Sequence, residues 1–300
     1  MKIFLRILFA VAALGLAAQA SALEVFACEP EWGALVKELG GDRMSVYVAT
    51  NAFQDPHRIQ AKPSLLARAR RANLVVCTGA ELEIGWMPVV LRQSGNDAIQ
   101  PDRPGYFEAA NFVQRLEIPS ALDRAAGDIH PGGNPHIQTD PRNIGRVATA
   151  LAQRLQEIDP GNRAYYQSRY QDFEKRWNAA IQRWNAQAAP LKGTPIVAHH
   201  KTFIYLENWL GLREVATLEP KPGVEPTSAH LADVLDQMKR QPAKIILRSP
   251  YNDARAAEWL NEKTKIPVVV IPETVGGSDN AKDLFGLFDD TVQRLLAALR

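Results

Sequence analysis

The 300-residue sequence has no marked excess of charge of either sign. It holds 35 lysines and arginines against 33 acidic residues, and two of the basic residues, Lys2 and Arg6, stand at its start. A chain without a basic excess lacks the electrostatic footprint of a nucleic-acid-binding protein. We therefore expect no nucleic acid among its partners.

Beyond its first residues, the chain also lacks an apolar run near the roughly 20 residues that span a bilayer. The apolar stretch at Ile7–Ala18 is shorter, follows Lys2 and Arg6, and ends at the small residues 20–22. This order is typical of a secretory signal peptide, which we assign to residues 1–22. No cysteine follows within a few residues to accept a lipid anchor. We predict a soluble protein released into a bacterial periplasm.

The common hydrolase motifs are missing as well. Neither HExxH nor GxSxG occurs, and no carboxylate lies at helical spacing from a candidate metal ligand to act as a general base. We predict that the protein is not an enzyme.

Short β-branched runs alternate with amphipathic stretches from residue 23 onward, and the same rhythm returns after residue 194. This alternation is typical of parallel sheets covered by helices, and about 278 residues exceed what one compact core usually holds. We predict an α/β fold of two lobes, each a mainly parallel sheet flanked by helices. The expected parts are an N-terminal lobe at 23–160, a long linking helix at 161–190 and a C-terminal lobe at 191–300.

The region between the lobes is predicted to be helical, with one helix over Pro141–Ile158 and a second over Arg163–Ala188. Six large apolar residues of the second helix are spaced at steps of three and four and form a single stripe, which predicts core packing. One helix that joins both lobes resists the wide hinge closure that two flexible strands allow. The stripe consists of Tyr166, Tyr170, Phe173, Trp177, Ile181 and Trp184.

Only two cysteines occur, Cys28 and Cys77, and each ends a candidate strand. An exported protein keeps its disulfides, so a bond between neighbouring strands fits the pattern. Two buried free thiols fit it equally well, because sequence spacing does not determine bond geometry.

Three of the six histidines, His57, His136 and His200, stand at predicted ends of strands or helices, where α/β folds bind their ligands. His199 and His200 are adjacent, so at a strand end only one of them faces a shared cleft. Imidazole nitrogens suit zinc. Three histidines with a carboxylate make a closed shell that favours carriage, whereas three histidines and a water make an open, hydrolytic one.

The spacing of residues in the sequence does not decide which carboxylate is the fourth ligand. Glu273 stands directly after the last predicted strand, whereas Asp279 and Asp283 stand near the start of the last helix, where carboxylates also serve as caps. Glu273 fits a solvated rim position equally well.

Four segments together resemble the metal-specific solute-binding proteins of ABC importers, and in particular their zinc branch. The resemblance implies two α/β lobes bridged by one long helix, with a metal buried in the cleft between the lobes. It implies His57, His136 and His200 as ligands, with Phe203 where the family places an aromatic residue. The segments are DPHRIQAKPS around His57, NPHIQTDP around His136, HHKTFIYLENWLGL around His200 and the closing TVGGSDNAKDLF.

The fourth ligand of this family is an aspartate after the last strand, which slightly favours Asp279 over Glu273. Many members of the zinc branch also carry a loop crowded with histidine and acidic residues. The corresponding stretch here, residues 118–135, offers only Asp128 and His130 and is expected to be a mobile surface loop.

The function implied is high-affinity binding of Zn²⁺ by a periplasmic monomer that delivers it to an inner-membrane ABC permease and its ATPase. The resemblance does not decide whether a periplasmic metallochaperone loads the protein with zinc. A histidine at the position of His200 favours zinc over manganese, which prefers more oxygen ligands. The alternatives are a manganese or iron carrier of the same family, a periplasmic zinc hydrolase with an open three-histidine site, a metal-free carrier of an organic solute, and an adhesin on the same scaffold.

Overall fold

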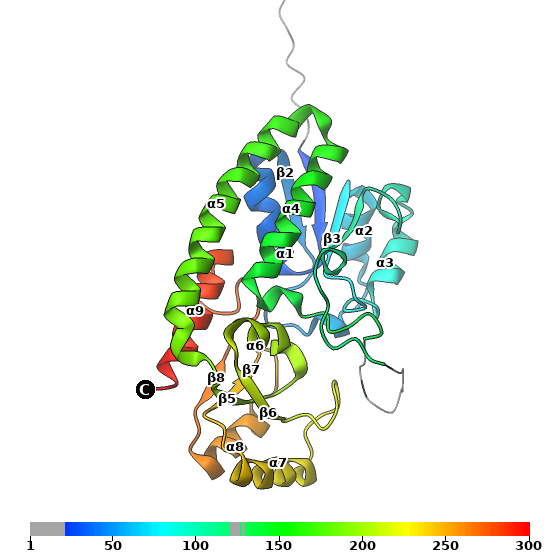
Figure 1. Ribbon diagram of the computed structural model, residues 1–300. Coiled ribbons are helices and arrows are strands. Elements are labelled where there is room, and N and C mark those ends of the chain that lie inside the picture. The colour runs from blue at the N-terminus through cyan, green and yellow to red at the C-terminus, as the bar shows by residue number, and fades with distance from the viewer. Residues whose placement is uncertain (1–21, 121–126, 128–129) are drawn as a thin grey trace, which may run out of the picture.

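The computed structural model describes residues 22–120, 127 and 130–300. Residues 1–21 of the predicted signal peptide and Asp128 of the 118–135 loop lie outside the described residues. Figure 1 shows two lobes, one above the other, with a long helix running along both. The predicted two-lobe α/β fold is confirmed.

The N-terminal lobe is built on a four-stranded sheet of order β2-β1-β3-β4 in which all pairs are parallel. Helices cover both faces of this sheet, and β1, at its interior, lies between β2 and β3 (Figure 1). The elements are β1 (Leu23–Ala27), α1 (Pro30–Gly40), β2 (Met44–Val48), α2 (Pro63–Arg71), β3 (Leu74–Cys77), α3 (Met87–Ser94), β4 (Tyr106–Glu108) and α4 (Pro141–Ile158).

The C-terminal lobe repeats this topology with the order β6-β5-β7-β8, again parallel throughout. Both sheets therefore have a switch point beside their first strand, and ligands of such sheets bind at the carboxyl ends of the strands. The elements are β5 (Pro195–Ala198), α6 (Ile204–Leu210), β6 (Arg213–Thr217), α7 (Ser228–Arg240), β7 (Ile245–Arg248), α8 (Arg255–Thr264), β8 (Val268–Val270) and α9 (Leu284–Ala297).

The linking helix α5 (Arg163–Ala188) has the bounds that the periodicity predicted, and so does α4. Its apolar stripe packs in one hydrophobic core that includes residues of both lobes. On α5, the ring of Trp177 lies 4.9 Å from that of Phe285, and the ring of Trp184 lies 5.2 Å from that of Phe288. Because α5 and α9 share this core, the lobes cannot part widely without exposing large aromatic side chains.

Two elements of the first lobe were not predicted, namely α3 and β4. Both are short, with eight and three residues, so neither carries enough periodicity to stand out from a loop. The cysteines, which the sequence left open, form a disulfide between Cys28 and Cys77, at the ends of the neighbouring strands β1 and β3.

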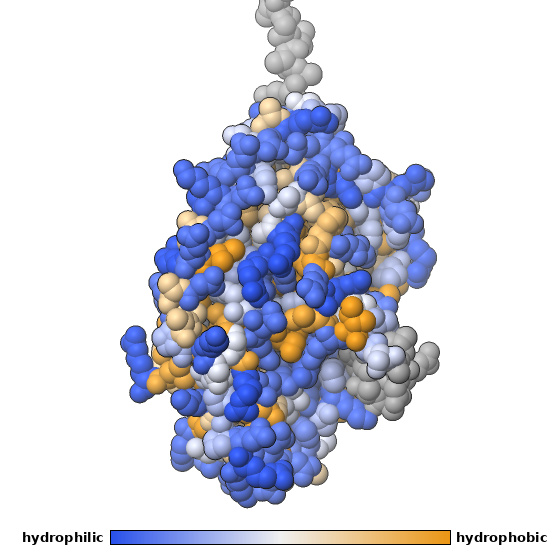
Figure 2. Space-filling view, in the orientation of Figure 1, coloured by the Kyte–Doolittle hydropathy of each residue, from blue (hydrophilic) through white to orange (hydrophobic). Residues whose placement is uncertain are grey.

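Among the described residues, no helix is both long and apolar enough to cross a membrane. The face shown in Figure 2 is largely hydrophilic, and its apolar residues are scattered in small patches.

Candidate metal centre

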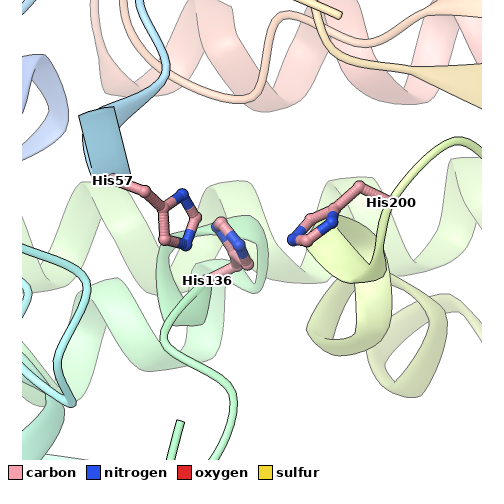
Figure 3. A group of neighbouring side chains, drawn as sticks. All are labelled: His57, His136 and His200. Carbon is pink, nitrogen blue, oxygen red and sulfur yellow. The ribbon is translucent and has the colours of Figure 1, made fainter. Parts of the chain in front are cut away.

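The structure brings three of the histidines together between the lobes. His57, His136 and His200 point toward one another (Figure 3), and each offers a ring nitrogen within 4.8 Å of those of the other two. The ring of His57 lies 5.4 Å from that of His136 and 6.0 Å from that of His200, and the last two are 5.5 Å apart. Because His57 and His136 precede α5 and His200 follows it, the cluster joins both lobes.

Each of these histidines is placed by a short 3-10 turn. The Asp55 carboxylate accepts the backbone N–H of His57 at 3.0 Å, and the Asn134 side chain accepts that of His136 at 3.0 Å. His200 stands in extended backbone just before its turn. Side chains of Asx residues stabilise such turns locally, which fixes where the rings start. The turns are η2 (Pro56–Arg58), η6 (Ile137–Thr139) and η9 (Lys201–Phe203).

Two of the three clustered histidines have ring nitrogens that make no hydrogen bond to any described residue. Nε2 of His57 and both nitrogens of His136 are buried without a hydrogen bond, and His136 is only 1% exposed. An unpaired buried polar group costs about 1–3 kcal/mol, so three in one place indicate a missing partner. A metal ion fits this need because it accepts electron pairs from several imidazoles at once.

The carboxylate of Glu273 lies beside the cluster, against His136. Glu273 follows β8, is 5% exposed, and places Oε1 3.6 Å from Nδ1 of His136. Its Oε2 is buried without a partner, and burial raises its pKa. The backbone of Glu273 has φ of +48°, a left-handed conformation that non-glycine residues adopt at a cost. These features make Glu273 the candidate for a fourth ligand that lies beside His136.

A contact between the lobes holds the segment that carries Glu273. The Thr274 hydroxyl donates a 2.5 Å hydrogen bond to Oε2 of Glu31, on α1 of the other lobe. Burial raises the pKa of Glu31 to about 8, against the lowering effect of this hydrogen bond. The position of the carboxylate therefore depends on how the lobes are packed.

The other candidate carboxylates lie elsewhere. Asp279 is exposed, and no hydrogen bond or ion pair between described residues joins its side chain to the histidines. Asp283, and not Asp279, caps α9, by accepting the N–H of Gly286 at 2.8 Å. Of the described residues Glu273, Asp279 and Asp283, only Glu273 pairs with a histidine of the cluster, His136.

Comparison with known proteins agrees with this geometry. The family model of the periplasmic component A of the zinc-uptake complex, ZnuA, matches residues 25–298. The chain belongs to the ZnuA family. A crystal structure of a ZnuA has the same fold, with a TM-score of 0.77 at 20% identity over 93% of this chain and 99% of that one.

The names of two curated relatives give different metals, zinc and manganese. The chain is 23% identical over 150 residues to the high-affinity zinc uptake protein ZnuA of Brucella abortus, which covers 50% of this chain and 45% of that protein. It thus spans about half the length of that relative. It is also 20% identical over 241 residues to the manganese-binding lipoprotein PsaA of Streptococcus pneumoniae, over 78% of this chain and 74% of that one.

Two carboxylates orient two of these histidines in this ZnuA-family chain, each through the ring nitrogen Nδ1. Asp55 Oδ1 lies 2.7 Å from Nδ1 of His57, and Glu219 Oε2 lies 2.7 Å from Nδ1 of His200. A carboxylate on one ring nitrogen fixes the tautomer and makes the other nitrogen a better metal ligand. Burial alone raises the pKa of Asp55, but the hydrogen bond and charge of His57 lower it overall. Both rings therefore present Nε2 to the centre.

The histidines differ in how readily they gain a proton. Burial and then the neighbouring histidines hold the pKa of His136 well below its ordinary value. Burial also disfavours the charged form of His200, but the hydrogen bond and charge of Glu219 raise its pKa overall. His200 is thus protonated at a higher pH than His136.

A fourth histidine stands beside the cluster. The ring of His130, in the 118–135 loop, lies 5.3 Å from that of His57 and is partly buried. Burial, followed by the charge of His57, lowers the pKa of His130 to about 3. This ring is neutral at physiological pH and lies next to the proposed ligands.

Replacing Glu219 by glutamine is expected to lower zinc affinity at neutral pH by about 10–100-fold, as is usual for a residue that orients a ligand. A zinc ion bound through His200 would displace its proton, so we expect zinc affinity of the wild type to fall as the pH drops through the raised pKa of His200. Without the Glu219 charge this pKa is lower, so the acid loss of affinity should move to lower pH. Zinc affinity measured against pH checks both effects. Glu258→Gln, an exposed change on α8, should leave the profile unchanged; an unshifted profile in Glu219→Gln contradicts the prediction.

The sequence did not single out Asp55 or Glu219. Asp55 carried a signal, since it belongs to the same Asp-Pro-His motif as His57 and lies two residues before it. Glu219 carried none, because it lies 19 residues from His200 on the next strand connection.

Proposed function

We propose that the protein binds one Zn²⁺ between its lobes with high affinity and delivers it to an inner-membrane ABC permease for import. The ligands are His57, His136, His200 and Glu273. The observation that carries the proposal is the convergence of three imidazoles from both lobes, of which His57 and His136 hold buried ring nitrogens without a hydrogen bond. Three neutral imidazoles and one carboxylate are the donor set that zinc favours in a tetrahedral shell.

The donor set supports zinc over manganese. Manganese prefers an oxygen-rich shell, and the cluster supplies nitrogen from three residues and oxygen from Glu273. The manganese-binding relative keeps a manganese or iron carrier as the second candidate. Zinc exceeds manganese in affinity for most nitrogen sites, so the two metals must be compared in direct competition.

The donor set also supports carriage over catalysis. A zinc hydrolase needs an open coordination position for a water, whereas here the buried carboxylate of Glu273 lies beside His136, and we assign it to that position. We propose a binding protein and not an enzyme. Its partners are the permease, its ATPase and, where loading is assisted, a periplasmic metallochaperone.

We further propose that the chain is exported after removal of residues 1–22 and works in the periplasm as a monomer. Residues 23–160 and 191–300 form its lobes, and residues 161–190 link them. The cleavage site is testable by N-terminal sequencing of the exported protein.

The test of the function is zinc stoichiometry and affinity, measured on apo-protein without residues 1–22 by competition with a chromophoric chelator. One zinc per chain, held against the chelator and not displaced by a large excess of manganese, is the expected result. Displacement by manganese at comparable concentration favours the second candidate. Protein that takes up neither metal contradicts the proposal and favours an organic solute.

A further inference from the structure

The carboxylate that orients His200 also holds a neighbouring loop. Glu219 Oε2, 2.7 Å from Nδ1 of His200, accepts the backbone N–H of Gly223 at 2.9 Å. Gly223 has φ of +74°, which a residue with a side chain adopts only with strain. The loop after β6 is thereby folded back toward the histidines, with the Gly223 carbonyl available to the other lobe.

Arg58 of the N-terminal lobe takes up that carbonyl. Its Nη2 donates to the Gly223 oxygen at 3.1 Å, across the gap between the lobes. Arg58 directly follows His57, and its Nε lies 3.6 Å from Oδ2 of Asp55, the carboxylate that orients His57. One side chain next to a proposed ligand therefore contacts the loop that supports another.

These contacts form a ring with two crossings between the lobes. One half of the ring belongs to the N-terminal lobe and the other half to the C-terminal lobe. The Arg58–Gly223 hydrogen bond makes one crossing, and a metal bound by His57 and His200 makes the other. The ring runs through His57, Asp55, Arg58, Gly223, Glu219 and His200.

The geometry points to the Arg58–Gly223 hydrogen bond as a latch that closes the lobes over the bound metal and slows its release. The inference rests on the proposed function, since it takes a metal between His57 and His200. Two crossings of one ring favour each other: the metal holds the lobes where the latch forms, and the latch holds the histidines where the metal binds. By linkage, each strengthens the other by the same factor. Arg58 is thus a positioning residue and not a ligand.

The surroundings of the latch suit controlled release. A cavity of about 110 Å³ lies against it, and His57, His200 and Glu219 are among its lining residues. Opening the latch would connect this cavity more freely to solvent. The Arg58 side chain is 61% exposed, so its hydrogen bond is weakened by water and by salt and can open readily.

The test compares wild type, Arg58→Ala and Arg71→Ala, all loaded with zinc. Arg71 is an exposed arginine of α2 in the same lobe, with no contact to the ring, and controls for lost charge. The zinc dissociation rate is measured by transfer to an excess of chromophoric chelator. We expect Arg58→Ala to release zinc about tenfold faster, a typical size for coupling between sites, and Arg71→Ala to behave as wild type.

Two further readouts separate a latch from a general structural role. Hydrogen exchange of the Gly223 N–H should be slow in the zinc-loaded wild type and faster in loaded Arg58→Ala. Raising salt from about 50 to about 500 mM should speed zinc release in the wild type more than in Arg58→Ala, because only the former has a charged latch to screen.

Equal release rates and equal Gly223 exchange in wild type and Arg58→Ala overturn the latch, and tight zinc binding by the wild type then leaves the proposed function standing. A wild type that does not retain zinc fails at the earlier step and overturns the proposed function itself.

Discussion

Replacing His136 by alanine is expected to lower zinc affinity by more than about 100-fold, beyond the usual cost of losing a residue that only orients a ligand. His136 is the most buried of the three histidines, and neither of its ring nitrogens makes a hydrogen bond. Its removal leaves two imidazoles and one carboxylate of the proposed ligand set. His57→Ala and His200→Ala should lose affinity in the same range.

The thermal stability of the His136→Ala protein, with and without zinc, provides a second test of this prediction. No hydrogen bond to the imidazole is lost, so the apo-protein should unfold near the temperature of wild-type apo-protein. Zinc should raise the unfolding temperature of wild type, since a ligand that binds only the folded state stabilises it, and should raise that of His136→Ala much less. Calorimetry with and without zinc measures both.

The matched control is His230→Ala. His230 lies on α7, with Nε2 2.9 Å from the Thr217 carbonyl oxygen and outside the histidine cluster. It should bind zinc like the wild type. If His136→Ala binds zinc as tightly as His230→Ala, the proposed site is wrong.

The variants Glu273→Gln and Asp279→Asn should differ widely in zinc affinity. Glutamine keeps the shape of Glu273 but removes the negative charge that offsets the metal, so we expect an affinity loss of about 100-fold, at the upper end of what orienting residues cost. Asp279 is exposed and contacts none of the histidines through its side chain, so its amide variant should stay within about twofold of wild type, as distant surface changes do.

Competition with a chelator on both variants measures this difference. The opposite order, with Asp279→Asn the weaker binder, would mean that the segment after β8 rearranges when zinc binds. Equal, undiminished binding in both would assign the fourth position to another donor, and His130 is then the nearest histidine to test.

The continuous core limits how the site can open. Aromatic contacts between α5 and α9 join the lobes, and so does the hydrogen bond between Thr274, next to Glu273, and Glu31. Small movements of loops such as the one around Gly223 expose little apolar surface, whereas parting the lobes exposes much. We therefore expect zinc release to depend on local opening.

The sequence by itself determined the fold class and singled out three histidines that the structure places together. Helices over Pro141–Ile158 and Arg163–Ala188 follow from periodicity, because a buried helix face needs apolar residues every three or four positions. His57, His136 and His200 could be named because each stands in a short motif at the end of an element. Such local patterns can be recognised in the sequence alone.

The tertiary structure alone decided which partners these residues have. The pairing of Cys28 with Cys77, the support of His200 by Glu219 and the approach of Glu273 in preference to Asp279 join residues from separate strand connections. Asp279 fitted the family motif slightly better, yet a left-handed turn at Glu273 directs that carboxylate inward. Sequence spacing does not encode such proximities, because they depend on how two sheets and their loops pack around a shared core.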